Sequence, residues 1–281
     1  KPLVFAFQAN VYCIILCKIL NVKIITRSNS SPSGWTQNNL KNYIFNKAFK
    51  KADKIIVNSL EFKKQFKKRF NVETECIYNP LNKKEILKKL KNKINLNFFK
   101  DNKKLKILNI GRFTDQKDHL TLLKSMKILK DKYKLNFILL IMGRGQNKSI
   151  IQNFIKKNNL NFNVKVIGFK KNPYKYIRCC DLFVLSSKFE GLPNVLLEAI
   201  TLKKFVISSN CPTGPNEILN NGKGGILFKT GNSDDLAKKI NFYYNNKKDL
   251  KKKIDFAYNN LDRFDFNTNL KKYFETITNF F

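Results

Sequence analysis

Two glutamates at a spacing of eight mark the segment best suited to bind a sugar. Glu190 precedes a turn of Gly191, Leu192 and Pro193, and Glu198 falls on the second turn of the helix that Pro193 would begin. The amides from Gly191 to Asn194 would open that helix, and free amides at a helix N-terminus attract anions. Carboxylates accept hydrogen bonds from hydroxyl groups. A pair of glutamates at this spacing usually arises by chance. Because this pair follows a predicted strand and spans a Gly-Leu-Pro turn, it predicts a ligand site.

A second segment, Gly111–Lys117, directly follows the predicted strand Leu105–Ile110. Gly111 lets the backbone approach a ligand closely. Arg112 and Lys117 place two cations at a strand-to-helix turn, where a diphosphate could be received. In so Lys-rich a chain the same residues also fit an ordinary basic surface turn, and the sequence leaves both interpretations open.

A third segment, Ser209–Glu217, follows the predicted strand Phe205–Ser208. Its Gly and Pro residues form a loop ahead of a short helix, so a second helix N-terminus could face a phosphate or a sugar. By itself this segment is only a loop that enters a helix.

Short strand-like runs alternate with longer helix-like segments along the whole chain. Parallel strands need a helical crossover, so this alternation predicts βαβ units and parallel sheets in an α/β fold. The expected strands are Leu3–Phe7, Lys23–Thr26, Lys54–Asn58, Glu75–Tyr78, Leu105–Ile110, Phe137–Met142, Val164–Ile167, Leu182–Leu185, Phe205–Ser208 and Gly225–Phe228. The expected helices are Ala9–Leu20, Gln37–Lys50, Glu61–Phe70, Lys83–Lys93, Leu120–Tyr133, Lys148–Asn159, Pro173–Cys179, Pro193–Leu202, Pro215–Asn220, Ser233–Asn245, Leu250–Asp262 and Thr268–Phe281.

The length of 281 residues predicts two domains. The polar stretch Asn92–Lys104 is the expected linker, which divides the chain into residues 1–97 and 98–264, and a C-terminal helix at 265–281 could pack back on the first part. The three candidate segments follow strands of the second part, where a doubly wound sheet binds its ligands. The first part is short for a doubly wound domain, so we expect it to be incomplete at its N-terminus.

The net charge of +35 arises from 55 Lys+Arg against 20 Asp+Glu, but only six of the basic residues are Arg. Nucleic-acid binders concentrate charge and use Arg forks, so we expect no nucleic-acid partner. An anionic membrane surface would attract the chain weakly. Hydrophobic residues make up 43%, which excludes disordered and fibrous classes. The apolar run Val11–Cys17 is too short to span a bilayer, so we expect a soluble cytoplasmic protein.

Other cofactor classes lack their motifs. The chain contains no D-x-D and no C-x-x-C pair, and His119 is its only His. Gly222-Lys223 has Glu217 where a Walker A motif needs its first Gly, and Gly143-Arg144-Gly145 continues to Lys148 where a dinucleotide fingerprint needs Gly. We therefore expect no metal and no prosthetic group.

Together these segments resemble the retaining glycosyltransferases of family 4, which have the GT-B fold of two Rossmann-like doubly wound domains facing a cleft. The resemblance rests on the Glu190-x7-Glu198 motif, Gly111–Phe113 with Lys117, and Pro212–Leu219. It extends to Gly143–Gly145 and Gly168-Phe169, and more weakly to Val57–Ser59 and Tyr78–Pro80. It covers essentially the whole chain and is densest from 105 to 230.

The resemblance implies a role for each site residue. Arg112 and Lys117 would neutralise the departing nucleotide diphosphate, beside Gly111. Glu190 would contact hydroxyl groups of the donor sugar. The backbone amides of Gly191, Leu192 and Asn194, together with Pro193, would lie near the sugar and the phosphate. Glu198 would hold the ribose hydroxyls, and the backbone at Phe169 would receive the base.

The resemblance also implies a substrate class. The loop Asn210–Glu217, with Thr26–Asn29 upstream, is most similar to members that use UDP-N-acetylhexosamines and extend polyprenol-linked or lipopolysaccharide-type glycans at the inner face of the cytoplasmic membrane. We expect transfer of a hexose or N-acetylhexosamine from a nucleotide sugar to such an acceptor. The alternatives are a GDP-mannose-dependent mannosyltransferase and an inactive nucleotide-binding fragment.

Overall fold

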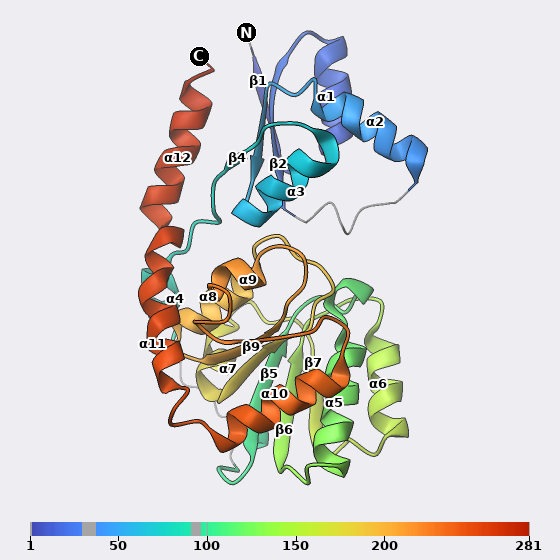
Figure 1. Ribbon diagram of the computed structural model, residues 1–281, viewed down its shortest axis with the longest axis vertical. Coiled ribbons are helices and arrows are strands. Elements are labelled where there is room, and N and C mark those ends of the chain that lie inside the picture. The colour runs from blue at the N-terminus through green and yellow to red at the C-terminus, as the bar shows by residue number, and fades with distance from the viewer. Residues whose placement is uncertain (1, 30–37, 91–96, 100, 281) are drawn as a thin grey trace.

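The computed structural model describes residues 2–29, 38–90, 97–99 and 101–280 (Figure 1). Two parallel sheets organise these residues. Within the described part, the first sheet holds the strands β1 (Leu3–Ala6), β2 (Lys23–Ser28), β3 (Lys54–Val57) and β4 (Glu75–Cys76), in that spatial order. The second sheet holds β5 (Leu105–Ile110), β6 (Phe137–Met142), β7 (Val164–Ile167), β8 (Leu182–Leu185), β9 (Phe205–Ser209) and β10 (Ile226–Phe228), in the order β10-β9-β8-β5-β6-β7.

The strands β6, β8 and β9 of the second sheet are buried on both faces. All six residues of β6 are buried, and its sequence is a continuous apolar run, as parallel strands covered by helices require. Alternate side chains point to opposite faces, so Leu139 and Ile141 enter one core cluster while Ile138 and Leu140 enter the other. This arrangement explains why the sequence predicted these strands almost to the residue.

Helices cover both faces of the second sheet. The first core cluster contains residues of α5 (His119–Asp131), α6 (Lys148–Lys157) and α10 (Ser233–Asn245). The second contains residues of α4 (Lys83–Lys88), α7 (Tyr174–Cys179), α8 (Asn194–Thr201), α9 (Pro215–Ile218) and α11 (Lys251–Asn259). The second sheet is therefore doubly wound.

The first sheet has a core of its own. The helices α1 (Asn10–Ile19), α2 (Asn39–Phe49) and α3 (Leu60–Phe70) pack on one of its faces. Phe62, Phe66 and Phe70 recur every fourth residue along α3, so they share one helix face, and all three are buried against the sheet. On the other face Ile25, Ile56 and Ile77 meet Tyr273 and Ile277 of α12 (Phe266–Thr278), which runs beside this sheet in Figure 1.

Several element ends differ from the sequence expectations. The helix expected over Lys83–Lys93 ends at Lys88, and the part of that expectation after residue 90 lies outside the described residues. The stretch expected as a linker contains the 3-10 helix η2 (Asn97–Phe99), whose Phe99 is buried in the second core cluster. The helix expected over Leu250–Asp262 is α11 followed by the 3-10 helix η4 (Asn260–Phe264), which buries Leu261 and Phe264.

Candidate functional site

The winding direction of the second sheet reverses at β5. From β5 the chain proceeds to β6 and β7 on one side, and then returns to β8, which pairs with β5 on the other side. Ligands of doubly wound sheets bind at this switch point, beyond the carboxyl ends of the strands. The loops that leave β5 and β8 contain Lys117 and Glu190, so both predicted residues reach the same place.

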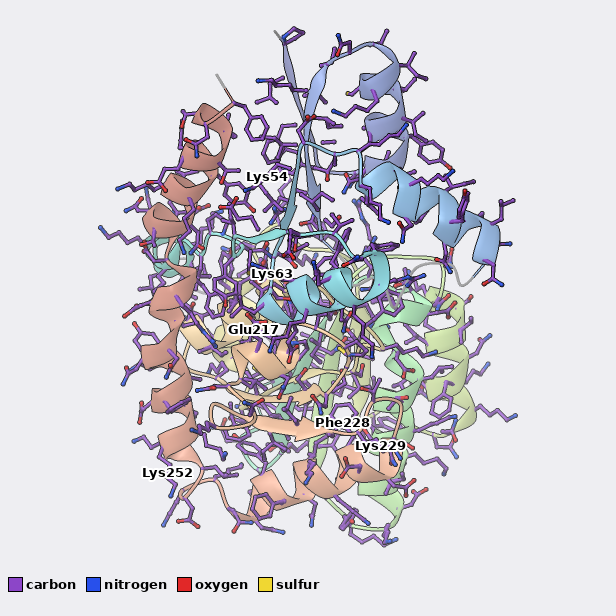
Figure 2. The ribbon with its side chains drawn as sticks, turned by 45° about the horizontal axis from the view of Figure 1, so that its top comes forward. Lys54, Lys63, Glu217, Phe228, Lys229 and Lys252 are labelled. Atoms are coloured by element: carbon purple, nitrogen blue, oxygen red, sulfur yellow. The ribbon has the colours of Figure 1, made fainter. Side chains whose placement is uncertain are left out.

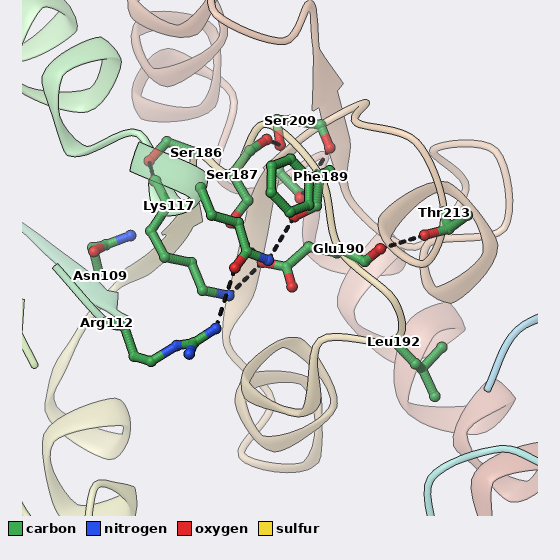
Figure 3. A network of polar contacts seen from close by, with 12 residues as sticks. Asn109, Arg112, Lys117, Ser186, Ser187, Phe189, Glu190, Leu192, Ser209 and Thr213 are labelled. Carbon is green, nitrogen blue, oxygen red and sulfur yellow. Dashed lines mark hydrogen bonds and ion pairs between the residues drawn. The ribbon is translucent and has the colours of Figure 1, made fainter. Parts of the chain in front are cut away.

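Lys117 and Glu190 form an ion pair at the switch point (Figure 3). Lys117 Nζ lies 2.5 Å from Glu190 Oε1, and the two side chains are 13% and 7% exposed. The Ser187 hydroxyl donates a second hydrogen bond to the same oxygen, at 2.6 Å. Glu190 Oε2 makes no hydrogen bond with any residue that the structure describes. One carboxylate oxygen is therefore fixed, and the other can accept a hydrogen bond from a ligand.

Gln116 ties the loop after β5 to the loop after β8. Its side-chain Nε2 donates to the Phe189 backbone carbonyl at 2.9 Å, and its backbone carbonyl accepts from the Lys188 amide at 2.8 Å. Its Oε1 accepts from Arg112 Nη2 at 3.2 Å, which orients an otherwise exposed guanidinium beside the ion pair. The cations at 112 and 117 are thus held on one side of Glu190.

Glycines let the neighbouring loops approach each other. A Cβ added to Gly143 would lie 1.9 Å from the Gly111 carbonyl oxygen, so only glycine fits there. Gly145 has φ +150° and lies against the backbone of Phe113. The loops after β5 and β6 are therefore packed backbone to backbone, and this contact sets the position of Gly111 and Arg112.

The third predicted segment supports the Glu190 loop from the other side. The Thr213 hydroxyl donates to the Glu190 carbonyl at 2.6 Å. A Cβ on Gly214, whose φ is +80°, would lie 2.0 Å from the Gly191 carbonyl oxygen. Gly191, Leu192 and Thr213 are all buried. The loop of Thr213 and Gly214 therefore packs against Glu190 and Gly191, which are expected to contact the sugar.

The helix α8 begins where the sequence predicted an anion site. Its N-cap residue Pro193 is extended and provides no side-chain cap, so the first amides of the helix lack a side-chain acceptor. Asn79 lies three residues after β4 of the first sheet. Its Nδ2 donates to the Leu192 carbonyl at 3.0 Å and to Asn194 Oδ1 at 2.6 Å. The loop ahead of α8 is thus held between the two sheets.

Glu198 lies on α8 without a partner. Its carboxyl group makes no hydrogen bond or ion pair with any described residue. Burial raises its pKa to about 7, and the charge of Lys89 opposes that shift. Burial, with the nearby charge of Glu198, also raises the pKa of Tyr174 to about 12. A half-buried carboxyl group with free oxygens is suited to accept hydrogen bonds from ligand hydroxyls.

Phe169 follows β7 and is 59% exposed. The Arg144 guanidinium lies 5.4 Å from the centre of its ring, and the Arg144 carbonyl accepts from the Phe113 amide at 2.8 Å. Phe169 is thereby connected to the loop of Arg112, although it makes no described contact with the ion pair.

His119 is a buried structural residue at the start of α5. Its ring lies edge-on to Phe113 and makes no hydrogen bond with a described residue. Burial, with the charge of Lys117, lowers its pKa to about 4, so the imidazole is neutral at pH 7.

The sequence did not point to Ser187, and it assigned no role to Gln116 or Thr213 although both lie within the predicted segments. Ser and Gln are common in loops and carry no spacing signal of their own. Ser187 could have been suspected because it lies three residues before Glu190 in the same strand-end loop.

Among the described residues no group of three or more His, Cys, Asp or Glu could hold a metal ion. The same residues contain no helix that combines the length and the apolar composition needed to cross a membrane. Association with an anionic membrane surface stays a prediction.

Comparisons with known proteins now identify the family. Residues 91–260, more than half of the chain, match the family Glycosyl transferases group 1. The chain belongs to this family. It is 40% identical over 178 residues to an uncharacterized glycosyltransferase of Methanocaldococcus jannaschii, which covers 61% of this chain and 43% of that protein.

A second relative has a specific name. The chain is 28% identical over 226 residues to the N-acetylgalactosamine-N,N'-diacetylbacillosaminyl-diphospho-undecaprenol 4-alpha-N-acetylgalactosaminyltransferase of Campylobacter jejuni. The match covers 78% of this chain and 59% of that protein. The chain thus spans about half the length of these curated relatives.

Among solved structures, Anabaena HepE in complex with UDP-glucose superimposes with a TM-score of 0.81 at 20% identity, covering 98% of this chain and 78% of that one. At this identity the likeness shows the fold. The predicted α/β GT-B fold with parallel sheets is confirmed, and so is membership of the glycosyltransferase family.

We expect Gly143→Ala to destabilise the protein, because its Cβ would overlap the Gly111 carbonyl oxygen. Overpacking of this kind lowers the free energy of unfolding by about 2 kcal/mol. Urea unfolding would show the loss as a lower midpoint concentration. Gly168→Ala is the matched control, since nothing lies within 4 Å of its added Cβ. Equal midpoints for both variants would contradict the packing described for these loops.

We expect Glu198→Gln to stabilise the protein at high pH. The folded-state pKa of about 7 lies above the value of 4.5 for a free carboxyl group, so the native state loses stability as pH rises through this range. The glutamine variant lacks that loss and should gain about 3 kcal/mol of unfolding free energy at pH 8, and much less at pH 5. Urea unfolding at both pH values measures the difference. The exposed Glu275→Gln is the control, and a gain at Glu198 that is the same at both pH values would refute the assignment.

Proposed function

We propose that the protein transfers a hexose or N-acetylhexosamine from a UDP-linked sugar to a lipid-linked or polysaccharide acceptor, with retention of the anomeric configuration. The observation that carries this proposal is the Lys117–Glu190 ion pair at the switch point, beside the uncapped start of α8. Family membership supports glycosyl transfer. The Campylobacter relative, named for a diphospho-undecaprenol substrate, supports a lipid-linked acceptor, and the UDP-glucose complex of HepE supports a UDP-linked donor.

The basic residues and the start of α8 would receive the diphosphate. A lysine ammonium has three donors, and Lys117 gives one of them to Glu190, so two are left for phosphate oxygens. The exposed Arg112 guanidinium can bind two oxygens of one phosphate as a fork. Because negative charge accumulates on the leaving diphosphate, cations and amides that are already in place lower the barrier to its departure.

Glu190 would bind sugar hydroxyls through Oε2. Its Oε1 already accepts from Lys117 and Ser187, and these two donors hold the carboxylate in place. Hydrogen bonds of this strength also withdraw charge from the carboxylate, which makes it a poor nucleophile. We therefore assign Glu190 to sugar binding and not to covalent catalysis.

Glu198 would hold the ribose hydroxyls, and the backbone at Phe169 would receive the base. The unpartnered carboxyl group of Glu198 supports the first assignment. The exposed ring of Phe169, next to Arg144, lies at the same edge of the second sheet as the diphosphate site.

We further propose that residues 1–97 form the acceptor side and residues 98–264 the donor side. The separate core clusters of the two sheets support two parts, and the cores also show Leu81 and Ile86, which precede residue 97, packed with the second sheet. GDP-mannose-dependent transfer, and nucleotide binding without transfer, are the alternatives that a donor survey distinguishes.

The decisive assay follows radiolabelled sugar from UDP-N-acetylhexosamine, UDP-glucose or GDP-mannose into an undecaprenyl-diphosphate-linked saccharide. Glu190→Gln should reduce transfer by roughly 100-fold, because it loses the charge that pairs with Lys117. Ser187→Ala, which removes one of two donors to Oε1, should reduce transfer by roughly 10-fold.

Lys127→Met is the control, because it breaks an exposed ion pair with Asp131 on α5 and should leave transfer unchanged. Full transfer by Glu190→Gln would refute the assignment of this residue. NMR of the product tests stereochemistry, and an inverted anomeric centre would refute retention.

A further inference from the structure

Glu217 lies on α9, which packs on the second sheet. The partners of its carboxylate lie in the part of the chain that carries the first sheet. Its Oε1 accepts from the Leu60 amide at 3.0 Å and from the Tyr78 hydroxyl at 2.7 Å. Its Oε2 accepts from the Glu61 amide at 3.1 Å. Figure 2 shows Glu217 next to α3, at the junction of the two sheets.

These bonds complete the N-terminus of α3. The first amides of a helix have no partner within the helix, and they carry the positive end of its dipole. The N-cap residue Ser59 satisfies the Phe62 amide at 3.1 Å. Glu217 satisfies the two amides before it, those of Leu60 and Glu61, with one carboxylate oxygen each. The helix is therefore capped jointly by its own serine and by a carboxylate from the other sheet.

The hydroxyl of Tyr78 adds a donor that stays protonated. Burial, and then its hydrogen bond to Glu217, raise the pKa of Tyr78 above its ordinary value. Tyr78 directly follows Ile77, a core residue of the first sheet. Glu217 thus holds both α3 and the chain that leaves β4.

The backbone of Glu217 is held by η4. Arg263 Nη2 donates to the Glu217 carbonyl at 2.6 Å and to the Ile218 carbonyl at 3.0 Å. Four residues earlier, Thr213 binds the Glu190 carbonyl. A short, hydrogen-bonded path therefore joins α3 to the residue that we assign to the donor sugar.

We propose that Glu217 is a positioning residue, which sets the orientation of the first sheet relative to the loop of Glu190 so that an acceptor bound there meets the donor sugar. The proposal rests on the proposed function, because it assigns the acceptor to the first sheet. Glu217 itself touches neither substrate. It acts through the start of α3.

Four variants test this role. Glu217→Ala removes all three bonds, while Glu217→Gln keeps Oε1 but turns an amide N–H toward the Glu61 amide. Tyr78→Phe removes one bond and leaves the cap of α3 in place. Asp235→Asn is the control, because Asp235 Oδ2 accepts from the Lys229 amide at 2.7 Å entirely within the part that carries the second sheet.

Four measurements are made well below the melting temperature of each variant: amide exchange, small-angle scattering, UDP binding and sugar transfer. In Glu217→Ala, amide exchange at Leu60 and Glu61 should accelerate at least 10-fold, and small-angle scattering should show a broader distribution of interatomic distances. The Kd for UDP should change less than threefold, while kcat for transfer falls at least 10-fold. Glu217→Gln should recover part of that loss, Tyr78→Phe should lose less than Glu217→Ala, and Asp235→Asn should match wild type.

Unchanged amide exchange and scattering in Glu217→Ala would overturn the proposal, and so would transfer that stays within threefold of wild type. A UDP affinity that falls in parallel with kcat would also overturn it, since it would show damage to the donor site itself. If the wild-type protein transfers no sugar, the proposed function fails. Exchange and scattering then still decide whether Glu217 orients the two sheets.

Discussion

The Lys117–Glu190 ion pair is the interaction on which the candidate site depends. A largely buried carboxylate is stable only with a partner, and Glu190 is only 5% exposed. The partner is available because the sheet order places β8 beside β5, although their loops lie 73 residues apart in the sequence. The same contact fixes one oxygen of Glu190, leaves the other free, and holds a cation at the switch point. Topology and electrostatics therefore favour the switch point as the place for the anionic ligand that we propose.

Two carboxylates that accept N–H or O–H donors join separate segments near the candidate site. Glu190 joins the loops after β5 and β8, and Glu217 joins α9 to α3. The Thr213 hydroxyl and the close contact of Gly214 with Gly191 connect the two carboxylates. Burial of such groups is costly unless every donor is well placed, so these contacts permit few alternative arrangements. A rigid Glu190 loop between the two sheets is the expected result.

The sequence predicted the second sheet closely because its strands are continuous apolar runs, as in Phe137–Met142. It was less successful where burial is decided by distant segments: Phe99 lies in the core although its stretch was expected to be a linker. The candidate residues were found from their types and positions after strands. The pairing of Lys117 with Glu190, the role of Ser187 and the bonds of Asn79 were not predictable, since they depend on which strands become neighbours. Local pattern indicates where a site lies, and tertiary contacts decide its chemistry.

The most direct test of a nucleotide-diphosphate site at the switch point is calorimetric titration of the protein with UDP, GDP and AMP. We expect selective binding of UDP, reduced 10- to 100-fold by Arg112→Ala, because one charge-assisted pair contributes about 1.5–3 kcal/mol. Arg178→Ala removes an equal charge elsewhere, at a residue whose Nη1 donates to the Leu90 carbonyl, and should have no effect. Selective GDP binding would keep the site and change the donor. Equal weakening by both arginine variants, or no binding of any nucleotide by the folded protein, would contradict the account.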